Sequence, residues 1–212
     1  MASSGQVRID KVVTSGTFSA DGETFDVDNN VWLVGDDSQV VVVDAAHDAA
    51  PIVAAVGGRE VVALLVTHGH DDHISAAADL ISATSAPVWL NPADRPLWDV
   101  VLASAPDHDL VDGSSVTVGD VELTALHLPG HSPGSTCLYA PALSTLFSGD
   151  TLFPGGPGRT TSAENFAQVL DGLEQRIFGV LPDETRVRPG HGDETTLGAE
   201  APHLAEWRAR GW

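Results

Sequence analysis

A cluster of metal-binding residue types interrupts an otherwise apolar stretch of the chain at Thr67-His68-Gly69-His70-Asp71-Asp72-His73. The residues before it, 61–66, are apolar and rich in β-branched side chains, which predicts a buried strand. The residues after it, 74–83, predict a helix. Imidazoles and carboxylates crowded between a strand and a helix would make a poor core, but they are well suited to holding metal ions.

The rest of the chain alternates between predicted strands and helices. We expect strands at 7–13, 31–34, 40–43, 61–66, 87–90, 116–118, 121–128, 136–139, 145–147 and 185–188. We expect helices at 48–56, 74–83, 93–104, 162–178 and over about ten residues ending near Arg210, with loops at 106–115 and 154–158. This order predicts a mixed α/β sandwich. No linker divides the chain, so we expect one domain over residues 1–212.

Three further candidate ligands follow other predicted strands. Residues 128–131 and 188–191 both end in Pro-Gly-His, with a histidine just past the end of a strand. Proline stops the strand ladder and glycine allows a sharp turn, so each histidine can be aimed outward. An aspartate, Asp150, closes the strand at 145–147 in a similar way.

These segments together supply seven candidate metal ligands: His68, His70, Asp72, His73, His131, Asp150 and His191. Seven exceeds what one tetrahedral zinc ion needs, whereas two ions that share a bridging carboxylate and a bridging water would use all of them. His68 and His70 are two residues apart and point to the same side of an extended segment. Asp72 and His73 can face a second ion, and an ionised Asp150 can bridge the two.

Charge and cysteine content limit the class of protein. The chain has 30 acidic and 10 basic residues, for a formal charge of −20. Such a surface repels nucleic acid and anionic membranes, so we expect neither as a partner. Cys137 is the only cysteine, which excludes an intrachain disulfide. The N-terminal residues do not resemble a signal peptide and no stretch approaches a membrane span, so we expect a cytoplasmic protein.

The motifs resemble those of the metallo-β-lactamase superfamily, and more closely those of its glyoxalase II-like hydrolases. The residues that carry the resemblance are 67–73, 128–135, 147–153, 158–160 and 189–192. The resemblance implies a four-layer αβ/βα sandwich with two metals at the open edge of its sheets. It assigns His68, His70 and His131 to one metal and Asp72, His73 and His191 to the other, with Asp150 bridging them and Asp44 supporting the site from behind.

The implied activity is metal-dependent hydrolysis by a hydroxide that bridges two divalent ions, zinc in preference to iron. Asp72 and Asp150 would orient that hydroxide and accept its proton. We expect a small-molecule thioester as substrate. The thiol is left open between glutathione and mycothiol types, because the chain lacks the basic helical region that holds glutathione in some relatives. A further departure is Ala46, where the family usually has glycine. The sequence also leaves the oligomeric state open, a homodimer included.

Other functions are compatible with the same motifs. A persulfide dioxygenase shares the fold and uses a single iron, and a lactonase or a β-lactamase is a third enzyme class. A regulatory metal-binding protein is the non-enzyme alternative. Several residues have two interpretations: Arg159 can bind a substrate carboxylate or form a structural ion pair, and His47 can pack in a turn or reach the site. We expect Asp71 to be solvated, Cys137 to be buried, and Trp98 to anchor the core or wall the pocket.

Overall fold

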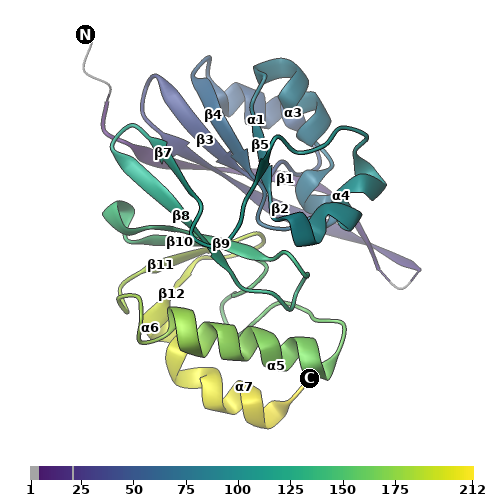
Figure 1. The fold of residues 1–212 in the computed structure, drawn as a ribbon, viewed down its shortest axis with the longest axis vertical. Helices are drawn as coiled ribbons and strands as arrows, with labels where there is room; N and C mark the ends of the chain where they lie inside the picture. The colour runs from purple at the N-terminus through teal and green to yellow at the C-terminus, as the bar shows by residue number, and fades with distance from the viewer. Residues whose placement is uncertain (1–4, 21) are drawn as a thin grey trace.

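A computed structural model describes residues 5–20 and 22–212 and contains two six-stranded sheets that pack face to face (Figure 1). The strands of the first sheet follow the chain in order. They are β1 (Arg8–Ala20), β2 (Glu23–Gly35), β3 (Gln39–Val43), β4 (Glu60–Leu65), β5 (Val88–Leu90) and β6 (His108–Asp109). The first three are antiparallel, and β3 to β6 are parallel to one another.

The second sheet has the order β12-β11-β10-β9-β8-β7. Its strands are β7 (Ser115–Val118), β8 (Val121–His127), β9 (Thr136–Ala140), β10 (Thr145–Gly149), β11 (Arg186–Pro189) and β12 (Thr195–Thr196). β10 and β11 are parallel, and the other neighbouring pairs are antiparallel.

Helices cover the outer face of each sheet, which gives four layers (Figure 1). The first sheet carries α1 (Ala49–Val56), α2 (Asp71–Ile74), α3 (Ala77–Thr84) and α4 (Arg95–Val101). The second sheet carries α5 (Ala163–Gly172), α6 (Leu197–Glu200) and α7 (Leu204–Arg210). The predicted mixed α/β sandwich is therefore confirmed. In the part of the chain that the structure describes, no helix is long and apolar enough to cross a membrane.

The uninterrupted valines of β3 follow from this layering. Val40 and Val42 pack toward the helices of the first sheet, whereas Val41 and Val43 pack toward the second sheet. Successive side chains of a strand point to opposite faces, so a strand covered on both faces must be apolar at every position. These residues form the two core layers on which the first sheet is built.

Several elements differ from the sequence-based expectation. β1 and β2 form a hairpin of 13-residue strands that extends past the rest of the sheet, whereas we expected only short strands at 7–13 and 31–34 (Figure 1). The helix expected at 93–104 is a 3-10 turn (Pro92–Asp94) followed by the shorter α4. The loop expected at 106–115 contains β6, and the helix expected at 74–83 is divided between α2 and α3.

Four segments with chemistry-bearing residues leave the sandwich at one edge. β3 and β4 are parallel, and so are β10 and β11, so the carboxyl ends of each pair lie together. Two backbone hydrogen bonds join the sheets there: Asn30 N donates to Gly190 O (2.7 Å), and Thr136 N donates to Thr67 O (2.8 Å). The segments that follow these strands therefore converge on one place.

Candidate metal centre

The ligand turn has the local structure that its sequence predicts. His70 has an extended backbone and is the N-cap residue of α2, while Asp72 and His73 lie in the single turn of that helix. His68 lies in the extended segment between β4 and α2, and only 1% of its surface is exposed. One seven-residue stretch therefore presents two side chains from extended backbone and two from a helical turn.

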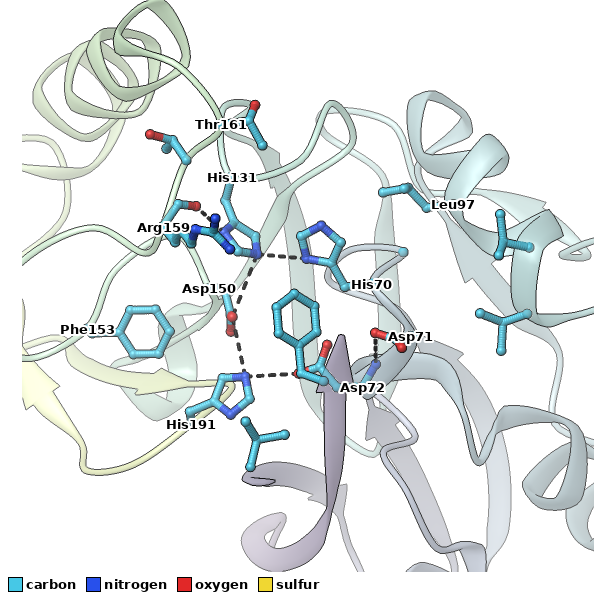
Figure 2. A pocket seen from close by; sticks show the side chains of 16 residues that line it. His70, Asp71, Asp72, Leu97, His131, Asp150, Phe153, Arg159, Thr161 and His191 are labelled. Atoms are coloured by element: carbon cyan, nitrogen blue, oxygen red, sulfur yellow. Dashed lines mark hydrogen bonds and ion pairs between the residues drawn. The ribbon is translucent and has the colours of Figure 1, made fainter. Parts of the chain in front are cut away.

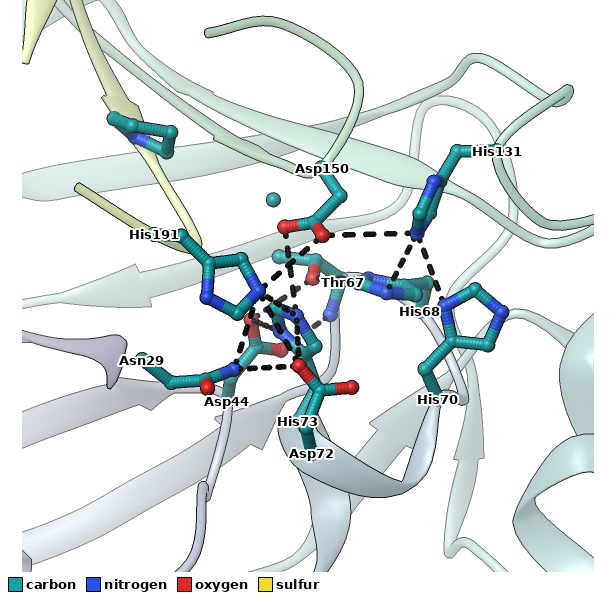
Figure 3. Close-up of polar contacts among 12 residues, drawn as sticks. Asn29, Asp44, Thr67, His68, His70, Asp72, His73, His131, Asp150 and His191 are labelled. Carbon is teal, nitrogen blue, oxygen red and sulfur yellow. Dashed lines mark hydrogen bonds and ion pairs between the residues drawn. The ribbon is translucent and has the colours of Figure 1, made fainter. Parts of the chain in front are cut away.

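Three imidazoles form the first ligand group, which consists of His68, His70 and His131 (Figure 3). His131 Nε2 lies 3.2 Å from His68 Nε2 and 3.0 Å from His70 Nδ1. Three ring nitrogens that converge in this way can donate their lone pairs to a single cation.

The second ligand group consists of Asp72, His73 and His191. Nε2 of His191 lies 3.3 Å from Nε2 of His73 and 3.2 Å from Oδ2 of Asp72. Asp72 Oδ2 is also 3.5 Å from His73 Nε2. Unlike the first group, this one contains a carboxylate among its ligand atoms.

Asp150 lies between the two groups (Figure 3). Its Oδ1 is 3.4 Å from His73 Nε2, and its Oδ2 is 3.4 Å from His191 Nε2 and 3.7 Å from His131 Nε2. The close approach of β11 requires glycine at position 190, because a Cβ there would collide with Asp150 Oδ1 and with the ring of His73. All seven residues that the sequence singled out are therefore brought together.

The separations fit two divalent cations. Ligand atoms about 2.0–2.1 Å from a tetrahedral zinc ion lie about 3.3 Å from one another. The separations measured here run from 3.0 to 3.7 Å. Among the described residues, no hydrogen-bond donor satisfies the buried Asp150 Oδ1. A cation on each side of Asp150 would be bound by this oxygen and by the converging nitrogens. The residues therefore fit the pair of metal ions that the sequence predicts.

The ring nitrogens that face away from the centre are held by acceptors. His131 Nδ1 lies 2.6 Å from the Arg159 carbonyl oxygen, and His191 Nδ1 lies 2.8 Å from the Asp28 carbonyl oxygen. A carbonyl oxygen only accepts, so both Nδ1 atoms carry hydrogen, and Nε2 is the nitrogen that each ring presents to a cation at the centre. Such contacts fix the tautomer and the ring orientation of a ligand histidine.

Asp44 supports both groups from below. Its buried carboxylate accepts hydrogen bonds from His73 Nδ1 (2.9 Å) and from Thr67 N (2.8 Å) and Oγ1 (2.9 Å). Because the Thr67 hydroxyl donates its one hydrogen to Asp44, it accepts from His68 Nδ1 at 3.1 Å. One carboxylate thus orients a histidine of each group, which agrees with the supporting role expected of Asp44.

The histidines of the two groups have opposite pKa shifts. Burial and the neighbouring imidazoles lower the pKa of His70 to about 4 and lower that of His68 well below its usual value. Burial also disfavours the charged form of His191, but its hydrogen bonds to Asp150 and Asp72 outweigh burial and raise its pKa to about 10. The pKa of His73 is raised in the same way by Asp150 and Asp72. Without a cation, His68 and His70 are neutral at pH 7, whereas His73 and His191 hold protons that a cation would displace.

Two buried polar residues that the sequence did not identify hold the ligands in place. Asn29 Nδ2 donates to Asp72 Oδ2 at 3.0 Å, and Asn29 Oδ1 accepts from His47 Nε2 at 2.7 Å. His47 is therefore not a simple packed turn residue, since it supports Asp72 through Asn29. In the sequence Asn29 lies among polar residues just before the apolar run 31–34, so no local signal marked it as buried.

Asp94 is the second such residue, and none of its surface is exposed. Its carboxylate accepts from Gly69 N (2.8 Å), Gly134 N (2.6 Å) and Ser132 Oγ (2.6 Å). It therefore joins the turn that carries His68 and His70 to the loop that carries His131. Asp94 lies near the start of the helix expected at 93–104, and no local pattern in the sequence marks this bridging role.

A cavity of about 550 Å³ opens above the ligands (Figure 2). Asp71 lines it but belongs to neither ligand group; its Oδ1 accepts from the Asp72 backbone N–H. Arg159 also lines it. Trp98 is fully buried in the core and does not wall the cavity, although its neighbour Leu97 does. Cys137 is buried, as expected, and burial raises the pKa of its thiol to about 12.

Comparison with known proteins places the fold and the site in context. A hydroxyacylglutathione hydrolase from Methylobacillus flagellatus is 36% identical over 77% of this chain, which spans 62% of that protein's length. The crystal structure of BLEG-1 B3 metallo-beta-lactamase has a TM-score of 0.75 at 29% identity, over 91% of this chain and 98% of that one. The structure of TTHA1623 in a di-iron-bound form has a TM-score of 0.69 at 34% identity, over 89% and 96% of the two chains.

The sandwich is thus shared over nearly the whole chain with solved metallo-beta-lactamase structures, which confirms the expected fold class. Residues 24–200, which include every candidate ligand, match the sequence pattern of one family. The chain belongs to the metallo-beta-lactamase superfamily.

Proposed function

We propose that the protein is a hydrolase that uses two divalent cations and cleaves thioesters of a low-molecular-weight thiol. The observation that carries the hydrolytic part is the position of Asp150, which faces a complete ligand group on each side at the floor of an open cavity. The thioester part is supported by the resemblance to hydroxyacylglutathione hydrolases, one of which is 36% identical.

A pair of bound cations supplies Lewis acidity and a hydroxide nucleophile at neutral pH. The residues of this chain position the reaction. Asp150 faces both groups, so it would hold the two cations beside each other and orient the nucleophile between them. Asp72, held by Asn29 at 3.0 Å, keeps the second side of the centre in place.

We propose zinc as the native metal, with iron as the competitor to test. Imidazole nitrogen and carboxylate oxygen are normal zinc ligands, and a catalytic zinc site keeps one position open. The same donors bind iron, and the similar protein TTHA1623 was solved in a di-iron-bound form. Elemental analysis of protein purified without added metal separates the two.

Hydrolysis of β-lactams is the second candidate function, favoured by the similarity to BLEG-1 B3 metallo-beta-lactamase over 91% of the chain. A mononuclear-iron persulfide dioxygenase needs only one occupied group. The completeness of both groups counts against it, and oxygen uptake on a thiol persulfide tests it directly.

The deciding experiment compares substrates on one metal-loaded sample. The panel contains S-lactoyl-glutathione, a thioester of a second small thiol, a lactone, a β-lactam and a glutathione persulfide. We expect thioester hydrolysis that is abolished by a chelator and restored by zinc. Turnover of the β-lactam without turnover of any thioester would replace this proposal with the second candidate.

A further inference from the structure

Helix α4 is apolar on two sides. Trp98 faces the core, where it is fully buried and donates from Nε1 to Ser104 O at 2.7 Å. Leu97, Val100 and Val101 lie at i, i+3 and i+4, which places them on one helix face, and all three line the cavity. A surface helix normally turns polar residues toward solvent. Here Val100 is 84% exposed, so its burial does not stabilise the fold.

The apolar face of α4 is held firmly beside the ligand turn. Asp94 precedes the helix and accepts from Gly69 N at 2.8 Å. Leu97 packs directly over Gly69, where an added Cβ would lie only 2.9 Å from Leu97 Cβ. The face therefore begins next to His68 and His70 and cannot easily move away from them.

The opposite side of the cavity carries polar side chains together with Phe153. Arg159, Thr160 and Thr161 line it, and Figure 2 shows Leu97 on one side of His70 and His131 with Arg159 on the other. Phe18 of the β1–β2 hairpin lies near the apolar side, with its ring centroid 5.8 Å from that of His70. The cavity thus has an apolar face on α4 and a mixed face that carries Arg159 and the two threonines, with the ligand groups at the floor between them.

Resting on the proposed thioester hydrolysis, we propose that the acyl group of the substrate is an apolar aliphatic chain that covers Leu97, Val100 and Val101. Low-molecular-weight thiols are polar, so the thiol half suits the side of Arg159 and the threonines. The scissile carbonyl then lies between the two halves, above Asp150. This assignment favours a simple fatty acyl group over the hydroxyacyl group of lactoyl thioesters.

The test varies the acyl group and keeps the thiol constant. The zinc-loaded protein is assayed on acetyl, butyryl, hexanoyl and lactoyl thioesters of N-acetylcysteamine. Each methylene that becomes fully buried raises kcat/KM by about fourfold, so we expect hexanoyl to exceed acetyl by at least tenfold and lactoyl to rank below butyryl. Equal values along the series, or a preference for lactoyl, would overturn the inference and leave thioester hydrolysis intact.

A matched pair of variants tests the surface itself. Val100→Ser combined with Val101→Ser removes exposed apolar area from the cavity, and we expect it to lower the hexanoyl-to-acetyl ratio of kcat/KM at least threefold. Val180→Ser changes a valine that is 61% exposed but does not line the cavity, and should leave the ratio unchanged. A ratio unaffected by the double variant would contradict the role given to α4.

Direct binding separates this inference from the proposed function. Dissociation constants of the zinc-loaded protein are measured for acetate, butyrate and hexanoate. Affinity that rises with chain length and is weakened by the double variant supports the apolar face even if no thioester is cleaved, in which case the proposed reaction alone has failed. Affinity independent of chain length would overturn the inference by itself.

Discussion

The two ligand groups are built from different chemistry, although they lie side by side and share Asp150. The first group has three imidazoles, and burial together with the neighbouring rings lowers the pKa of His70 to about 4 and that of His68 well below its usual value, so these two rings are neutral at neutral pH. The second group includes Asp72, and its hydrogen bonds to carboxylates raise the pKa of His191 to about 10. At neutral pH a cation can therefore bind His68 and His70 without displacing a proton from them. In the second group, a cation must displace the protons of His73 and His191.

Because the two groups differ in protonation, we expect the two cations to bind in two distinguishable steps. A cation in the first group would bind imidazole nitrogens only. A cation in the second group would also bind the Asp72 carboxylate, but it must displace the protons held by His73 and His191. Asp150 faces both groups and therefore takes part in both binding steps.

Asp150→Ala removes the carboxylate that faces both groups. We expect both cations to be lost on dialysis, and hydrolysis to fall by more than the roughly 100-fold that loss of an outer hydrogen bond costs. Metal content is measured by elemental analysis and turnover on the best thioester. A variant that keeps two metals and full activity would refute the shared role of Asp150.

His131→Ala and His191→Ala each damage one group. We expect each variant to retain about one equivalent of zinc, and the remaining ion to differ between them in its pH dependence, because a different group survives in each. His203→Ala is the matched control, since that histidine is largely exposed and outside both groups. Loss of both equivalents from either variant would show that the groups do not bind independently.

Acidification should empty the second group before the first. A proton and a cation compete for His191 Nε2, and the raised pKa of about 10 means that the proton is held throughout the neutral range. Lowering the pH therefore weakens the second group by about tenfold per unit for each proton released. His70, with a pKa of about 4, should retain its lone pair down to much lower pH. Zinc stoichiometry between pH 5 and 9 tests this, and simultaneous loss of both ions would contradict it.

Asn29→Ala should produce the smallest effect, confined to the second group. The substitution removes the donor that holds Asp72 Oδ2 and leaves His47 without its partner. We expect zinc affinity of the second group to fall by about tenfold, the lower end of what an outer hydrogen bond contributes. Competition with a chromophoric chelator measures it. Partial recovery in Asn29→Gln would support a positioning role, whereas equal weakening of both groups would indicate a general structural defect.

The seven candidate metal ligands could be predicted from the sequence alone. The turn from Thr67 to His73 stands out because metal-binding residue types adjoin each other there. His131, Asp150 and His191 could be added because each follows a predicted strand. The carboxyl ends of neighbouring parallel strands meet at one edge of a sheet, which explains how β10 and β11 bring Asp150 and His191 together. Strand prediction does not give the pairing of the strands or the packing of the two sheets, which place these residues beside the turn from Thr67 to His73.

The supporting residues could not be predicted in the same way. Asn29 contacts Asp72 across 43 positions of the chain, and Asp94 contacts Gly134 across 40. Neither lies in a local pattern that specifies its partner. The apolar face of α4 was missed for a related reason, since a short helix with apolar residues on two sides resembles a buried helix unless its surroundings are known. The long β1–β2 hairpin was missed because its distal half is polar and exposed, without the apolar alternation that marks a half-buried strand.

We propose that two cations share Asp150 and that both are needed for hydrolysis. Native mass spectrometry of metal-free protein titrated with zinc, with thioester turnover followed on the same samples, tests it most directly. We expect two zinc ions per chain at saturation, with turnover appearing as the second ion binds. Full turnover at one zinc per chain, with no second ion bound, would contradict it.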